Sequence, residues 1–150
     1  MFTHILVPLD RSEDAARAIE PALSLAQTYG ARITLLMVMF RAPLSHPGEG
    51  AFLDQYVEQH GQQYLDEICA TRMRGPSVPV DRVVRLGTAA EGILECAVES
   101  YADLIVMSAY GATGTRDGLG STALKILHEA PCPVLLLRAK PPGEPGLDAG

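Results

Sequence analysis

Short apolar runs alternate with amphipathic stretches along the chain. Five runs are continuously apolar or nearly so and predict buried strands at 3–9, 31–40, 80–86, 102–109 and 131–138. Between them, apolar residues recur at intervals of three and four. This spacing predicts amphipathic helices at 12–30, 52–69, 88–101 and 121–130. The expected order is strand and helix in alternation, beginning and ending with a strand.

This alternation is typical of a parallel sheet with helices on both faces. Because crossovers between parallel strands are right-handed, few topologies remain. We expect the α/β class, with an open, doubly wound, five-stranded parallel sheet in the order 3-2-1-4-5. The domain should span residues 1–139, and the Pro- and Gly-rich residues 140–150 should form a disordered tail.

Composition and charge limit the classes of binding partner and the cellular compartment that we expect. The net charge is -6 without a basic cluster, which argues against nucleic acid or a membrane surface as a partner. We see neither a run of about 18 apolar residues nor a signal peptide. The three cysteines are widely spaced and lie in apolar contexts, which favours free, buried thiols. We therefore expect a cytoplasmic protein.

A glycine-rich stretch, SAYGATGTRDGLGST at 108–122, joins the fourth strand to the last helix. In the expected sheet it lies beside the loop after the first strand, where such folds bind ligands. The helix start at Ser121 offers unpaired N–H groups, Gly120 leaves room for a phosphate, and Ser121 and Thr122 add hydroxyls. Arg116 could add a cation. The same residues also suit a plain surface loop in which Ser121 caps the helix.

The sequence does not fit other known motifs for nucleotide binding, metal binding or catalysis. No lysine follows these glycines in the register of a P-loop. Residues 118–123 match a loose dinucleotide motif, but they follow the fourth strand instead of the first. The histidines show no metal-ligand spacing, so we expect no metal site. Asp10 and Asp103 should lie at opposite ends of the sheet, so we predict no catalytic residues.

Three stretches together resemble the universal stress protein (UspA-like) family. They are ILVPLDRSEDAARAIEPALSLAQTYGARITLLMV, VVRLGTAAEGILECAVESYADLIVMSAYG and GSTALKILHEAPCPVLLLR, and the similarity extends over about 3–138. The resemblance implies the adenine nucleotide alpha hydrolase-like fold. It also implies either an ATP-binding or a non-binding member, because the family contains both.

ATP-binding members carry GxxG, nine residues, and then G[ST]. Here Ser108 replaces the first glycine, and eight residues separate Gly111 from Gly120. A serine costs on the order of 1 kcal/mol if its φ must be positive; otherwise its hydroxyl is available for contacts. The resemblance implies that ATP, with or without Mg²⁺, contacts Pro8, Asp10, Val38, Met107, Ser108, Gly111, Gly120, Ser121 and Thr122.

The last strand is expected at an edge of the sheet, with apolar residues on both faces. Exposed edges of this kind invite pairing, and the resemblance implies a homodimer through Val134, Leu135, Leu136 and Leu137. We expect a stress-response regulator that depends on bound nucleotide, with at most slow ATP hydrolysis. One alternative is a dimeric interaction module that binds no ATP. The other is a small α/β enzyme, such as a protein that acts on phosphate esters or transfers electrons.

Overall fold

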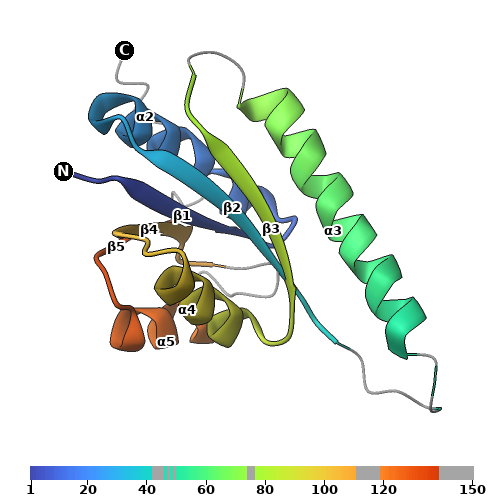
Figure 1. Cartoon of the computed structure of the whole chain (residues 1–150). Helices are drawn as coiled ribbons and strands as arrows, with labels where there is room; N and C mark the ends of the chain where they lie inside the picture. The colour runs from blue at the N-terminus through green and yellow to red at the C-terminus, as the bar shows by residue number, and fades with distance from the viewer. Residues whose placement is uncertain (42–45, 47, 49, 74–76, 111–118, 139–150) are drawn as a thin grey trace, which may run out of the picture.

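Five parallel strands form one sheet in the order β3-β2-β1-β4-β5, as predicted (Figure 1). The computed structural model describes residues 1–41, 46, 48, 50–73, 77–110 and 119–138, so the predicted tail lies outside the described residues. The strands are β1 His4–Leu9, β2 Arg32–Met39, β3 Val80–Leu86, β4 Leu104–Ser108 and β5 Val134–Leu137. All six residues of the central strand β1 are buried.

The helices cover both faces of the sheet (Figure 1). They are α1 Glu13–Ala16, α2 Ile19–Tyr29, α3 Gly50–Arg72, α4 Ala89–Glu99 and α5 Ser121–Glu129. Alternate residues of β1 serve two cores: Ile5 and Val7 pack toward α1, α2 and α3, and Leu6 packs toward α4 and α5. None of the helices in the described parts is long and apolar enough to cross a membrane.

The first predicted helix is divided into α1 and α2. Pro21 has no N–H to donate to the carbonyl four residues earlier, so a continuous helix cannot form there. The chain instead makes a tighter turn, in which the Ala18 N–H donates to the Ala15 carbonyl at 3.1 Å. The predicted ends are confirmed: Ser12 caps α1, and Gly30, with φ +67°, ends α2.

Three apolar residues of the predicted amphipathic helices are exposed. Phe52 is 75% exposed and Tyr56 is 56% exposed, because the start of α3 reaches beyond the sheet (Figure 1). Val98 is 60% exposed. It lies five residues after buried Ile93, which places it roughly 140° around the helix axis and away from the sheet.

Two helices approach the sheet through a glycine. A Cβ at Gly61 of α3 would lie 2.9 Å from a methyl carbon of Val84 on β3. A Cβ at Gly92 of α4 would lie 2.7 Å from a methyl carbon of Val38 on β2. Both distances are far below carbon–carbon contact, so each glycine permits a close approach that any other residue would prevent.

Side-chain hydrogen bonds connect the start of β1 to neighbouring segments at the amino ends of the central strands. The Asp103 carboxylate accepts from the Thr3 N–H and hydroxyl, each at 2.8 Å, and from the His4 N–H at 3.1 Å. The His4 ring lies 2.6 Å from the Thr34 hydroxyl and 2.8 Å from the Ser100 carbonyl. Asp103 therefore stands at the end of the sheet opposite Asp10, as predicted, and holds the start of β1.

We predict that Asp103→Asn lowers the free energy of unfolding at pH 7 by about 1 kcal/mol. Burial by itself raises the pKa of the Asp103 carboxyl, but the hydrogen bonds from Thr3 and His4 outweigh burial and lower it overall. A lowered folded-state pKa adds stability above the usual value of about 4, and this stability is lost as the pH falls through the folded-state value.

The measurement is urea unfolding of both proteins at pH 7 and pH 3. The gap between wild type and Asp103→Asn should shrink at the lower pH, because protonation removes the advantage of the carboxylate. An equal gap at both values would contradict the assigned role.

Candidate functional site

A proline in the central strand opens the crevice at the carboxyl edge of the sheet. The His4 carbonyl accepts from the Asp103 N–H at 3.0 Å, so alternate residues of β1, including Pro8, direct their backbone groups toward β4. Pro8 has no N–H to give. The pairing of β1 with β4 ends at Leu6 and Ile105, and a pocket lies beyond that point.

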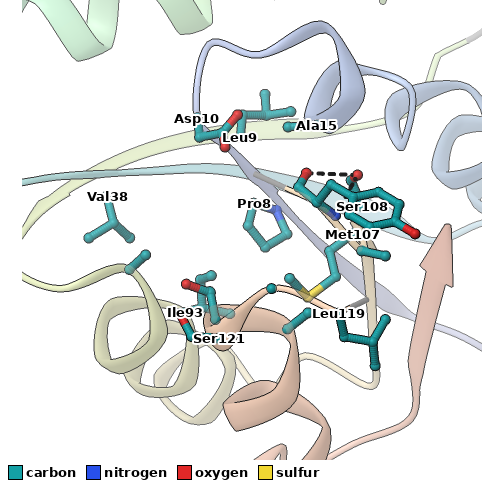
Figure 2. A pocket seen from close by; sticks show the side chains of 16 residues that line it. Pro8, Leu9, Asp10, Ala15, Val38, Ile93, Met107, Ser108, Leu119 and Ser121 are labelled. Carbon is teal, nitrogen blue, oxygen red and sulfur yellow. Dashed lines mark hydrogen bonds between the residues drawn. The ribbon is translucent and has the colours of Figure 1, made fainter. Parts of the chain in front are cut away.

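The pocket has a volume of about 380 Å³ and lies where β1, β2 and β4 end and α4 and α5 begin (Figure 2). Eight of the nine predicted nucleotide contacts line it: Pro8, Asp10, Val38, Met107, Ser108, Gly120, Ser121 and Thr122. Gly111 and Arg116 fall within 111–118, outside the described residues. Segments more than 100 residues apart in the chain therefore meet in one cavity.

Several lining residues were not predicted. Ala89 and Ile93 come from α4, Ala15 comes from α1, and Tyr110 follows β4. The two α4 residues were detectable in principle. A helix that follows a parallel strand starts at the carboxyl edge of the sheet, so its first turns lie beside the crevice.

Asp10 is held in place by the start of α1. Its carboxylate accepts from the Ser12 N–H at 2.9 Å and from the Ser12 hydroxyl, and that hydroxyl in turn accepts from the Ala15 N–H at 3.0 Å. Arg11 between them has φ +69°, a left-handed conformation that costs a non-glycine residue roughly 1 kcal/mol. The guanidinium of Arg11 lies 5.9 Å from the centre of the Tyr64 ring.

Ser108 replaces a glycine of the family motif without backbone strain. The described non-glycine residues with positive φ are Arg11 and Tyr101, so the conformation of Ser108 is open to any residue. Its hydroxyl donates to the Tyr110 carbonyl at 2.9 Å and accepts from the Tyr110 N–H at 3.2 Å (Figure 2). The serine therefore stabilises the turn at the end of β4.

The start of α5 faces the pocket without a side-chain cap. Gly120 is the N-cap residue and Ser121 the first helical residue, so the expectation that Ser121 caps the helix is wrong. No side chain of the described residues caps α5 in place of Gly120. Among the described residues, a Cβ at Gly120 would meet the Ala109 carbonyl oxygen, at 3.5 Å. As far as the described residues are concerned, the first-turn N–H groups of α5 are therefore open to an anion.

The pocket lining is partly apolar and partly polar. Val38, Ile93 and Met107 contribute apolar surface suited to a flat, uncharged ring, with Val38 and Met107 on either side of Pro8 (Figure 2). Asp10 and Ser121 lie across the cavity from each other, with Pro8 between them (Figure 2). The arrangement can therefore accommodate an elongated molecule with an aromatic end and an anionic end.

Comparison with known proteins identifies the class. Residues 1–138 match the model of the Universal stress protein family, and the chain belongs to that family. The universal stress protein in the QAH/OAS sulfhydrylase 3′ region of Thermus aquaticus is 37% identical over 141 residues, which cover 92% of this chain and 100% of that relative.

Solved structures share the architecture. Universal stress protein UspA from Lactobacillus plantarum aligns with a TM-score of 0.79 at 26% identity, covering 91% of this chain and 98% of that one. A universal stress protein family protein from Arabidopsis thaliana, with AMP bound, aligns with a TM-score of 0.61 at 20% identity and covers 96% of each chain. The fold is the adenine nucleotide alpha hydrolase-like fold.

Proposed function

We propose that this chain binds an adenine nucleotide, specifically ATP, in the pocket at the carboxyl edge of the sheet. The observation that carries the proposal is the uncapped start of α5 in the same cavity as the Asp10 carboxylate. The domain, residues 1–139, then acts in the cytoplasm as a nucleotide-dependent regulator of the stress response. A cytoplasmic location fits its three cysteines, which are all free.

The phosphates would lie against α5. The partial positive charge of the helix N-terminus and its unpaired N–H groups attract an anion, and Ser121 and Thr122 add hydroxyl donors. We propose Arg116 as a further cation that contacts the phosphates. ATP would enter with or without Mg²⁺, because the ion can be carried by the phosphates themselves.

The adenosine would lie against the apolar part of the pocket lining. Val38 and Met107 offer apolar contact to the base, and the carboxylate of Asp10 can accept hydrogen bonds from ribose hydroxyls. The Arabidopsis protein with AMP bound shows that this fold can hold an adenine nucleotide. For this chain, the support comes from its own pocket.

The second candidate function is a dimeric interaction module that binds no ATP. It is favoured by the hydroxyl of Ser108, which is engaged with Tyr110, and by the loop that is one residue shorter than the motif of ATP-binding members. The two functions differ in a single measurable property, the affinity for ATP.

We predict that ATP raises the melting temperature of the wild type and that Gly120→Val removes the effect. The valine would fill space beside the phosphate position, so affinity should fall about tenfold or more. Stability without ligand should fall by no more than about 1 kcal/mol, because valine is a poorer N-cap residue than glycine although its Cβ would have ordinary contact with Ala109.

Ala51→Val is the control, since it places a valine at an exposed residue near the start of α3. Calorimetric titration with ATP, AMP and GTP gives the affinities. An equal ATP-induced shift in Gly120→Val would place the ligand elsewhere, and no shift in the wild type would favour the interaction module.

We further propose that the protein is a homodimer joined through β5. The Ile105 N–H donates to the Pro133 carbonyl and the Ala109 N–H to the Leu137 carbonyl, so the backbone groups of Val134 and Leu136 point away from β4. Those outward groups are the ones a second copy can pair with.

Exposed apolar side chains lie on the elements at this edge. Leu135 of β5 is 37% exposed, and Leu124 and Leu127 of α5 are each 45% exposed. Covering them would add a hydrophobic contribution to the backbone pairing between the strands.

We predict that Leu135→Lys weakens the dimer about tenfold or more, because a charged side chain on an edge strand opposes pairing. Val98→Lys is the control, because Val98 is 60% exposed on α4, away from β5. Light scattering and sedimentation at micromolar concentration report the mass. A monomeric wild type would refute the proposed dimer.

A further inference from the structure

Gly92 is a buried residue in the second turn of α4, next to the pocket. Its neighbour Ile93 lines the pocket, and so does Ala89 one turn earlier. Val38 of β2, which a Cβ at Gly92 would meet, forms part of the same wall. We propose that Gly92 is a positioning residue, which sets the width of the base end of the pocket through Val38 and α4. The inference rests on the proposed adenine-nucleotide site.

A side chain at position 92 would collide with both methyl groups of Val38. A Cβ there would lie 2.7 Å from Cγ2, 2.9 Å from Cγ1 and 3.4 Å from Cβ. The three nearest atoms therefore all belong to one valine. Contacts under about 3 Å between carbon atoms are strongly repulsive, so the neighbour or the helix must move.

Rotation of Val38 cannot relieve the collision. Valine fills two of its three staggered γ positions in every rotamer. Two of the three positions are the ones within 2.9 Å of a Cβ at Gly92. Every rotamer therefore leaves at least one methyl group in conflict, and the strain passes to the backbone of β2 or of α4.

Either movement changes the base wall. If β2 yields, Val38 is displaced relative to the pocket that it lines. If α4 yields, Ala89 and Ile93 move with it, because they belong to the same rigid helix. The apolar surface that would receive the base is thus fixed by the absence of a side chain at Gly92.

The molecule contains a second contact of the same kind, away from the pocket. A Cβ at Gly61 of α3 would lie 2.9 Å and 3.1 Å from the two methyl carbons of Val84. Neither Gly61 nor Val84 lines the pocket. Gly61→Ala therefore imposes a similar packing strain without touching the site, and it separates loss of stability from loss of binding.

The experiment is a double-mutant cycle on the full chain, read by calorimetric titration with ATP and by melting temperature without ligand. Gly92→Ala should weaken ATP binding about tenfold, the effect typical of one misplaced methyl group in a closely fitting apolar pocket. Val38→Ala removes both colliding methyl groups. In that background, Gly92→Ala should change the affinity by less than about twofold.

The control should behave differently from Gly92→Ala. Gly61→Ala should lower the melting temperature and leave the affinity within about twofold of wild type. If Gly92→Ala alone does not fold, the comparison of Val38→Ala with Val38→Ala/Gly92→Ala still decides the matter. Those two proteins should agree in affinity, and the double variant should melt no lower than Val38→Ala, because alanine favours the helix more than glycine does.

The experiment distinguishes failure of the inference about Gly92 from failure of the proposed function. If the wild type binds ATP and Gly92→Ala binds it equally well, the role of Gly92 is refuted and the proposed function stands. The role of Gly92 is also refuted if Gly92→Ala weakens ATP binding equally in the wild-type background and in the Val38→Ala background. If the wild type binds neither ATP nor AMP, the proposed function falls and the inference falls with it.

Discussion

The site lies where the two central strands stop pairing with each other. Pro8 lies in the central strand with its backbone directed toward β4, and it has no N–H to donate. Prolines are rare in the middle of a sheet because each one costs a pairing position. Here the pairing of β1 with β4 ends at Leu6, and Pro8 beyond it lines the pocket at the carboxyl edge.

Around this opening, each wall is held by a different kind of contact. Asp10 is fixed by hydrogen bonds to Ser12, the turn at Ser108 by hydrogen bonds to Tyr110, and α4 by direct contact of Gly92 with Val38. The start of α5 is bonded to the end of β4 through the Gly120 N–H and the Ala109 carbonyl, at 3.1 Å. The cavity is therefore largely preformed, which reduces the ordering that a ligand must impose.

Strand order could be predicted from sequence, because it follows from the alternation of apolar strands with helices. Half of the lining could be named as well, but residues such as Val38 and Met107 depended on the family resemblance and not on this alternation. The break between α1 and α2 was also detectable, since Pro21 is a local signal. The contact of Gly92 with Val38 was not, because it depends on the position of α4 over β2, which no local pattern encodes. The exposure of Val98 follows from the helical period, which turns it away from the buried face that contains Ile93.

The N–H of Ala109 donates to the Leu137 carbonyl at 2.8 Å, and Ala109 also lines the pocket. One peptide group thus belongs both to the cavity and to the outermost strand. A displacement of that peptide reaches the rim of the sheet through the main chain alone, without any side-chain relay. Substitutions on the surfaces of the helices would leave this hydrogen bond in place, because both of its groups belong to the main chain.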